Sequence, residues 1–210
     1  MENEQIEVAK RLLAIDTIKI QPDIPFTWAS GWKSPIYCDN RKVLSFPETR
    51  TFICSQFVKL IREKYPNAEA IAGVATGAIA HGVLVADALQ LPFIYVRSKP
   101  KGHGLENLIE GDIQPGTKVV IIEDLISTGG SSLSAAEAVR NYGAEFLGML
   151  AIFTYNFPIA TKNFQEANIE LTTLSNYNLL LKLAYDSGEI TDEQLESLNN
   201  WRKSPETWGR

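Results

Sequence analysis

The part of this sequence with the clearest chemistry is residues 119–132. Val119–Ile122 is continuously apolar and predicts a buried strand, after which Glu123 and Asp124 place two carboxyl groups in succession. Hydroxyl-bearing residues and glycines follow, and they open a predicted helix. Backbone N–H groups in such a turn, together with the positive end of a helix dipole, form an anion site. We therefore expect this segment to bind a phosphate group.

The two carboxyl groups limit which class of phosphate-containing ligand this segment is expected to bind. Carboxylates beside a phosphate would repel it, so we expect them to accept hydrogen bonds from sugar hydroxyls or to lie near a divalent cation. A ribose 5-phosphate meets both conditions, with its hydroxyls on Glu123 and Asp124 and its phosphate on Ser127–Ser131. The segment has neither the GK[ST] of a Walker loop nor the GxGxxG of a dinucleotide site. The alternative is an ordinary strand-to-helix turn with surface acids.

A second segment carries the opposite charge. Arg97, Lys99 and Lys101 fall within five residues, His103 follows them, and neighbouring glycines supply backbone freedom. A basic loop with glycine hinges fits a lid that closes over a polyanion. The alternative is a solvated charged loop, which the nearby phosphate motif makes the weaker interpretation.

Three segments together resemble one known family. Residues 119–132 resemble the phosphoribosyl-diphosphate motif of type I phosphoribosyltransferases. Residues 28–37, WASGWKSPIY, resemble the N-terminal signature of the orotate phosphoribosyltransferases. Residues 95–104, YVRSKPKGHG, resemble the mobile catalytic loop of that family, and NLIEG follows at 107–111. The matches span most of the chain in the expected order.

The resemblance implies an enzyme that transfers the 5-phosphoribosyl group from phosphoribosyl diphosphate to N1 of orotate. The products are orotidine 5'-monophosphate and diphosphate, and the step belongs to de novo pyrimidine (UMP) biosynthesis. The implied cofactor is Mg²⁺, which would be held through the substrate with Asp124 nearby and without a direct protein ligand.

The resemblance also implies roles for individual residues. Catalysis falls to Lys101, His103 and Asp124. The residues implied to bind phosphoribosyl diphosphate come from the basic loop and from the phosphate motif: Arg97, Lys99, Lys101, His103, Glu123, Asp124, Leu125, Ile126, Ser127, Thr128, Gly129, Gly130 and Ser131.

Orotate binding is implied for Lys33, Tyr37 and Ser127. Many members of the family also place an arginine after the strand predicted at 147–153, where it pairs with the carboxylate of orotate. This chain has Thr154–Phe157 there and no arginine. Lys33, Ser127 or loop amides remain as alternative partners for that carboxylate.

Three further residues, in two segments, depart from the family pattern. Some members have Tyr-Lys where this chain has Thr76 and Gly77, so this part of the anion site must depend more on backbone amides. Ser98 stands where many members have lysine, and Lys99 is a possible substitute. In the family the basic loop closes over the substrate of the neighbouring subunit, which implies a homodimer with shared sites.

Two other functions stay open at this point. One is a phosphoribosyltransferase for a purine base or uracil, against which residues 30–37 and 97–104 argue. The other is a regulator that senses phosphoribosyl diphosphate without catalysis. The acidic charge of the chain and the presence of Lys101 argue against the regulator.

The elements that must position these residues alternate along the chain. Continuous apolar strands separated by helices predict an α/β fold of the type I phosphoribosyltransferase kind, with a mainly parallel sheet flanked by helices. We expect a single domain, 1–210, with a small hood from about 1–40 plus C-terminal elements. Strands are predicted at 70–74, 93–96, 118–122 and 147–153. Helices are predicted at 6–14, from a capping box at Ser45 to Lys64, at 78–89, at 131–142 and as a polar surface helix from a capping box at Thr191.

The composition and charge of the chain exclude several classes of protein. The chain has 210 residues, 45% of them hydrophobic, and a formal net charge of −5, which argues against a general nucleic-acid binder. The N-terminus lacks a signal-peptide pattern, and the longest apolar stretch is too short to cross a membrane. Cys38 and Cys54 fit reduced thiols better than a disulfide framework or a zinc site. We expect a cytoplasmic protein without nucleic-acid or membrane partners. His81 is expected to be a packed or surface histidine rather than a catalytic residue.

Overall fold

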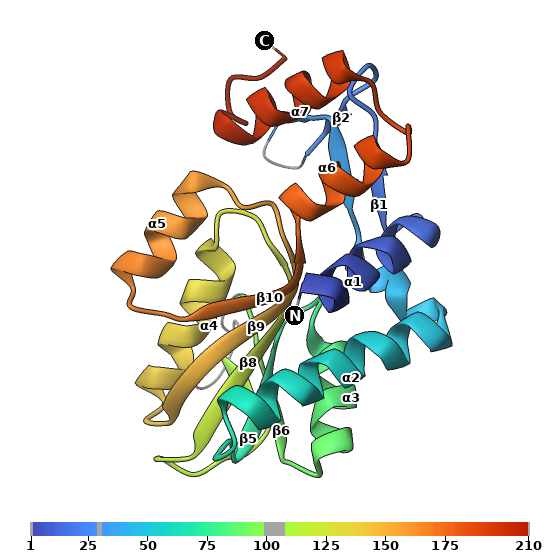
Figure 1. The fold of residues 1–210 in the computed structure, drawn as a ribbon. Helices are drawn as coiled ribbons and strands as arrows, with labels where there is room; N and C mark the ends of the chain where they lie inside the picture. The colour runs from blue at the N-terminus through green and yellow to red at the C-terminus, as the bar shows by residue number, and fades with distance from the viewer. Residues whose placement is uncertain (1, 29–30, 99–107, 210) are drawn as a thin grey trace.

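A computed structural model describes residues 2–28, 31–98 and 108–209, and its main feature is a six-stranded sheet (Figure 1). The strands, in order across the sheet, are β10 (Leu171–Asn176), β9 (Glu145–Thr154), β8 (Lys118–Ile126), β5 (Ala70–Val74), β6 (Phe93–Val96) and β7 (Ile109–Glu110). Neighbouring strands are parallel except for β6 and β7, which are antiparallel. The predicted α/β fold with a mainly parallel sheet is confirmed.

Helices cover both faces of this sheet (Figure 1). Helices α1 (Glu2–Ala14), α2 (Pro47–Lys64) and α3 (Ile79–Leu89) lie on one side, and α4 (Gly130–Asn141) and α5 (Pro158–Glu166) lie on the other. The central strands are therefore shielded from water on both faces, and all five residues of β5 are buried. This burial explains why their sequences are apolar without alternation.

A smaller layer lies above the carboxyl ends of the strands (Figure 1), and we call it the hood. It contains two antiparallel pairs, β1 (Ile18–Ile20) with β4 (Ile36–Cys38) and β2 (Phe26–Thr27) with β3 (Lys33–Ser34). Two C-terminal helices, α6 (Tyr177–Asp186) and α7 (Asp192–Lys203), complete it. Because β10 leads directly into α6, the chain enters the hood at the same edge of the sheet where parallel strands present their ligands.

Aromatic side chains join the hood to the sheet. The Trp201 ring of α7 lies 5.6 Å from Trp28 and 5.1 Å from Phe157, measured between ring centroids. Tyr155 stacks on Phe157 at 5.4 Å, and Tyr177 lies 5.5 Å from Trp201. Large aromatic rings buried in such contacts contribute strongly to stability. Trp28 is therefore a packing residue of this junction.

Several local predictions require correction. Ser45 does not cap α2: it ends a 3-10 helix, η1 (Asn40–Ser45), and the N-cap of α2 is Phe46, which makes no side-chain capping bond. The capping box at Thr191 is present, with hydrogen bonds in both directions to Gln194. Helix α7 is not simply a polar surface helix, because Trp201 is fully buried.

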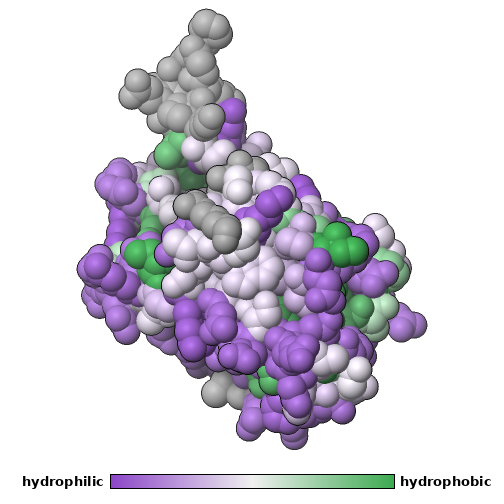
Figure 2. Space-filling view, turned by 90° about the horizontal axis from the view of Figure 1, so that it is seen from above, coloured by the Kyte–Doolittle hydropathy of each residue, from purple (hydrophilic) through white to green (hydrophobic). Residues whose placement is uncertain are grey.

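The face of the molecule seen from above combines hydrophilic residues with a central area of intermediate hydropathy (Figure 2). In the view from this side (Figure 2), hydrophobic residues form separate patches between larger hydrophilic areas. Among the residues that the structure describes, no helix is both long enough and apolar enough to cross a membrane. The hydrophobic residues of the chain are instead concentrated in the sheet and in the helix faces packed against it.

Candidate active site

A cavity of about 340 Å³ lies where β5 and β8 end below the hood. These strands are parallel neighbours, with Gly73 opposite Ile122, so their carboxyl ends open into one space. The structure thus brings the predicted acids and Leu125 together with the turn after β5. The cavity wall comprises Cys38, Asp39 and Arg41, residues 74–77, residues 123–125 and Ser131.

Glu123 is the buried acid of the pair. Only 4% of its surface is exposed, and its two carboxylate oxygens accept hydrogen bonds from Ser132 Oγ at 2.8 Å and from the Asp124 backbone N–H at 3.0 Å. Burial raises the pKa of Glu123 well above its ordinary value, and the neighbouring charge of Asp124 adds to that rise. Both oxygens therefore already serve to hold the end of β8.

Asp124 is the more accessible acid. Its backbone oxygen accepts a hydrogen bond of 2.5 Å from Asn40 Nδ2, which ties β8 to η1. Its carboxylate occupies the space beside Gly77, and a Cβ atom at Gly77 would overlap Asp124 Oδ2. This explains why residue 77 carries no lysine side chain here: the Asp124 carboxylate occupies the space that such a side chain would need.

The expected phosphate loop lies at the start of α4. Gly129 is the N-cap residue of this helix and has φ +86°, a backbone conformation that favours glycine. A Cβ atom there would also approach Phe164 of α5 to 2.7 Å. Asn163 Nδ2 of α5 donates to the Thr128 carbonyl oxygen at 3.0 Å. Helix α5 therefore holds the turn in which the first N–H groups of α4 are presented.

Ser127–Ser131 follow β8 in this order, and only Ser131 lies on the cavity wall itself. Ile126 is completely buried, so its side chain packs in the core and only its backbone is available to a ligand. Strand β8 also runs to Ile126, beyond the predicted end at Ile122, because Leu125 and Ile126 still pair with β9.

Lys33 and Tyr37 are not on the cavity wall. Lys33 is exposed on β3 and donates from Nζ to Thr27 Oγ1 at 2.9 Å. The Tyr37 side chain is 41% exposed and lies 5.6 Å from the Phe26 ring. Tyr37 directly precedes Cys38, which is on the wall, but its own side chain is not among the residues that line the cavity.

The base of the basic loop is formed by β6 and β7. Arg97 follows β6, and its backbone N–H donates to the Leu108 carbonyl oxygen at 2.8 Å. Its Nη1 donates to Glu110 Oε1 at 3.2 Å. Ser98 is exposed. Lys99, Lys101 and His103 lie outside the described residues, so the structure places only the first of the four predicted basic groups.

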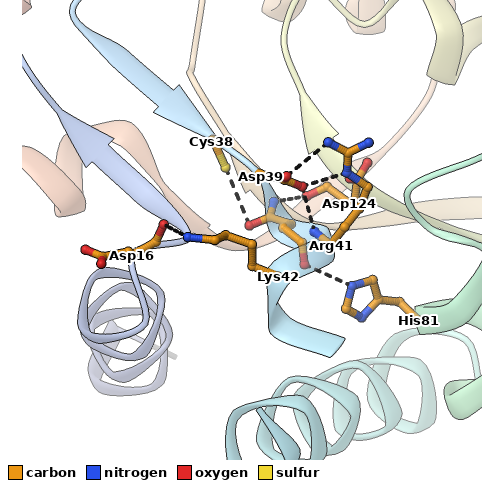
Figure 3. Close-up of polar contacts among 8 residues, drawn as sticks. Asp16, Cys38, Asp39, Arg41, Lys42, His81 and Asp124 are labelled. Atoms are coloured by element: carbon orange, nitrogen blue, oxygen red, sulfur yellow. Dashed lines mark hydrogen bonds and ion pairs between the residues drawn. The ribbon is translucent and has the colours of Figure 1, made fainter. Parts of the chain in front are cut away.

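The residues Asp39, Asn40 and Arg41, which come soon after Tyr37, were not predicted as site residues. They are central to the hood side of the site (Figure 3). Asp39 accepts hydrogen bonds from Arg41 Nε at 2.6 Å and from Arg41 Nη2 at 3.0 Å. This contact lowers the pKa of Asp39 and raises the pKa of Arg41. Asn40 is buried and bonds to Asp124. The run DNR at 39–41 follows the N-terminal signature after Cys38, and its polar character was the signal available in the sequence.

His81 and Cys38 both pack against Asn40. His81 Nε2 lies 3.3 Å from the Asn40 carbonyl oxygen, and Cys38 Sγ donates to Asn40 Oδ1 at 3.5 Å (Figure 3). Burial lowers the pKa of His81 and raises the pKa of the Cys38 thiol well above its ordinary value. His81 is only 3% exposed and is therefore the packed one of the two expected alternatives, and both cysteines are free thiols.

The acids of the cavity do not form a protein cage for a metal ion. Within the described ranges, no group of three or more His, Cys, Asp or Glu side chains is arranged to hold one. Glu123 is engaged by Ser132 and by the Asp124 N–H, and Asp39 is engaged by Arg41. This donor set fits a cation that is carried by a ligand and has Asp124 nearby.

Comparisons with known proteins agree with this geometry. Residues 52–168 match the family described as "Phosphoribosyl transferase domain". An orotate phosphoribosyltransferase of Porphyromonas gingivalis is 59% identical over 202 residues, which cover 96% of this chain and 96% of that protein. One from Streptococcus thermophilus is 53% identical, covering 96% of this chain and 97% of the relative.

The fold comparison gives the same result. The crystal structure of orotate phosphoribosyltransferase from Aeropyrum pernix superposes with a TM-score of 0.75 at 26% identity, covering 85% of this chain and 98% of that chain. Taken with the near full-length relatives at more than half identity, this means that the chain belongs to the orotate phosphoribosyltransferase family.

Proposed function

We propose that this chain transfers the 5-phosphoribosyl group from phosphoribosyl diphosphate to N1 of orotate, releasing diphosphate and forming orotidine 5'-monophosphate for pyrimidine biosynthesis. The observation that carries the proposal is the cavity in which Asp124, the start of α4 and the turn after β5 converge. The 59% and 57% identity to relatives named orotate phosphoribosyltransferase supports the choice of base.

The proposed catalysis is mainly electrostatic. Breaking the bond between C1 and the diphosphate creates positive charge on the ribose and negative charge on the leaving group, so the site must hold the ring and stabilise both charges. Asp124 is proposed to accept hydrogen bonds from the ribose hydroxyls. Glu123, whose oxygens are bound to Ser132 Oγ and the Asp124 N–H, keeps the end of β8 in place.

The 5-phosphate is assigned to residues 127–131, where N–H groups at the start of α4 are available to an anion. Leu125 and Ile126 contribute backbone and packing to this turn. Mg²⁺ is proposed to bind through the diphosphate and the ribose hydroxyls, where it offsets negative charge. Asp124, the partly exposed acid of the pair, would lie near that cation.

Closure of the basic loop completes the site in this proposal. Arg97, Lys99, Lys101 and His103 neutralise the diphosphate and exclude water from the activated sugar. The loop acts on the cavity of the neighbouring subunit, so the working unit is a homodimer of single-domain chains. The Arg97–Glu110 contact supports a fixed base for the loop.

Orotate is assigned to Lys33, Tyr37 and Ser127. Tyr37 offers an exposed aromatic ring one residue before Cys38 of the cavity wall, and Lys33 offers a positive charge for the orotate carboxylate. Orotate can arrive deprotonated at N1, so the site needs no strong base. We place the reaction in the cytoplasm, where free thiols such as Cys38 and Cys54 are the ordinary state.

The decisive experiment follows the absorbance of orotate after phosphoribosyl diphosphate is added, with Mg²⁺ and with a chelator. We expect orotate to be consumed only when the metal is present. Lys101→Ala should lower kcat about 100-fold with a milder loss of substrate affinity. Turnover of hypoxanthine or uracil but not orotate would overturn the choice of base. Binding of phosphoribosyl diphosphate without turnover of any base would favour a regulator.

A further inference from the structure

Arg41 has a distinctive place on the cavity wall. Among the described residues that line this cavity, it is the only one with a basic side chain. The acids on the same wall are Asp39, Glu123 and Asp124. A diphosphate ligand would bring further negative charge into this space. A fixed positive charge on the hood side would offset part of that repulsion.

The opposite wall supplies no such charge. The turn after β5 contains Thr76 and Gly77, and the side-chain space beside Gly77 is occupied by the carboxylate of Asp124. A basic side chain at residue 77 would therefore collide with Asp124 in this arrangement. The positive charge for this end of the cavity has to come from another element, and Arg41 reaches the cavity from η1.

The contact with Asp39 orients the guanidinium group. Asp39 caps η1 by accepting the Arg41 backbone N–H at 3.2 Å, and its two oxygens accept from Nε and Nη2 of the same residue (Figure 3). These two side-chain bonds use two of the five N–H donors of an arginine, and the Arg41 side chain is 60% exposed. A pre-oriented guanidinium group with free donors matches the bidentate geometry of phosphate oxygens.

We propose that Arg41 binds the diphosphate group of phosphoribosyl diphosphate from the hood side of the cavity. The proposal rests on the proposed function for the identity of the ligand. It adds a positively charged residue that belongs to the same subunit as Asp124, whereas the proposed basic loop comes from the neighbouring subunit. Part of the diphosphate site is then present before the loop closes.

The competing explanation is a purely structural ion pair that stabilises the start of η1. Two ligands that differ at C1 separate the explanations: phosphoribosyl diphosphate carries the diphosphate group, and ribose 5-phosphate does not. Binding of each is measured by titration calorimetry in the presence of Mg²⁺ and without orotate. The variants are Arg41→Gln, Asp39→Asn and the matched control Lys42→Gln, whose exposed side chain donates to the Asp16 carbonyl oxygen at 3.0 Å.

Arg41→Gln should weaken the binding of phosphoribosyl diphosphate at least about tenfold. It should change the affinity for ribose 5-phosphate less than about twofold. Lys42→Gln should leave both affinities unchanged. Asp39→Asn retains the arginine and an oxygen acceptor for it and removes a negative charge from the cavity wall, so it should weaken the binding of phosphoribosyl diphosphate less than Arg41→Gln does. An equal loss for both ligands, or an equal loss in Arg41→Gln and Asp39→Asn, would overturn the proposal.

The result is independent of the base. Wild-type binding of phosphoribosyl diphosphate with no turnover of orotate would contradict the proposed function and leave the Arg41 comparison valid. Normal orotate turnover with unchanged calorimetry in Arg41→Gln would contradict the Arg41 proposal alone.

Discussion

Gly77 and Asp124 show how one residue type limits the position of another. The turn after β5 and the end of β8 approach so closely that a side chain at Gly77 and the observed carboxylate position of Asp124 exclude each other. Because the Asp124 carboxylate approaches the backbone of residue 77 directly, this residue cannot carry a functional side chain. A positively charged side chain can then reach the cavity from the hood side, as Arg41 does.

Gly77→Ala is therefore expected to act through Asp124. The added methyl group must displace the carboxylate, and a misplacement of about 1 Å can lower kcat/KM about 100-fold. Asp124 is only partly buried, so thermal unfolding should change little. The double variant Gly77→Ala/Asp124→Ala should be no less active than Asp124→Ala alone. A further loss in the double variant would show that Gly77 acts by a different route.

Glu123 gives a pH-dependent prediction for the ligand-free protein. Its folded-state pKa is raised, so the folded state binds the proton more tightly than the unfolded state does. The contribution of Glu123 to stability is fully present below its unfolded pKa of about 4.3 and is lost as the pH rises toward the raised folded value, by about 1.4 kcal/mol per pH unit.

Glu123→Gln stays neutral and escapes this loss. Its free energy of unfolding relative to the unmodified protein should therefore improve steadily from about pH 4.3 upward. Urea titrations at several pH values measure the difference. The control is Glu137→Gln on α4, an exposed position where a difference within about 0.5 kcal/mol is expected. A difference for Glu123→Gln that does not change with pH would contradict the buried carboxyl assignment.

At the scale of the elements, the sequence predicts four of the six strands of the sheet, β9, β8, β5 and β6. The predicted ranges 70–74 and 93–96 coincide with β5 and β6, because a strand buried on both faces must be apolar throughout. The predicted end of β8 is wrong: Glu123 still pairs with Ala151 of β9, so polar residues at a strand end do not stop the ladder. Residues that act as ligands can thus remain part of a strand.

The hood and the C-terminal elements are much less predictable. Helices α5 and α6 and strand β10 were not predicted individually, and α7 reads as polar along most of its length. The role of α7 depends on Trp201, whose four ring partners are distant in sequence and belong to three other segments. Patterns within a short window cannot reveal such contacts. The same limit applies to Arg41, whose function depends on where η1 packs.

Trp201 provides the corresponding test. Its ring is fully buried against Trp28, Phe157 and Tyr177, and its Nε1 donates to the Lys33 carbonyl oxygen at 3.3 Å. Trp201→Ala should lower the free energy of unfolding by about 3–5 kcal/mol, because it removes a large aromatic ring from a packed cluster. Tyr185→Phe is the control, since it removes only an exposed hydrogen bond to Asp192 and should cost less than about 1 kcal/mol. Similar losses in both variants would show that α7 is not anchored by its tryptophan.

At the scale of the whole molecule, net charge is a poor guide to the ligand. The chain carries a net charge of −5, yet the proposed substrate is a polyanion. The conflict is resolved locally if helix dipoles, Arg41, the basic loop and Mg²⁺ act on one small cavity, since fields at close range outweigh the charge of distant, screened groups. The proposed division of these cations between two subunits makes the dimer necessary for the chemistry.

This division can be tested by complementation. Lys101→Ala and Asp124→Asn are each expected to inactivate the enzyme, one through the loop and one through the cavity. If the loop acts on the neighbouring subunit, a mixed dimer contains one site with both Lys101 and Asp124 intact and one site lacking both. Random pairing on co-expression should therefore restore about a quarter of the wild-type activity. A loop that acted on its own subunit would leave every site defective, and the mixed preparation would show no more activity than the two variants alone. If each variant carries a different affinity tag, the mixed dimers can be purified through both tags. The restored activity should then be found in this mixed-dimer fraction.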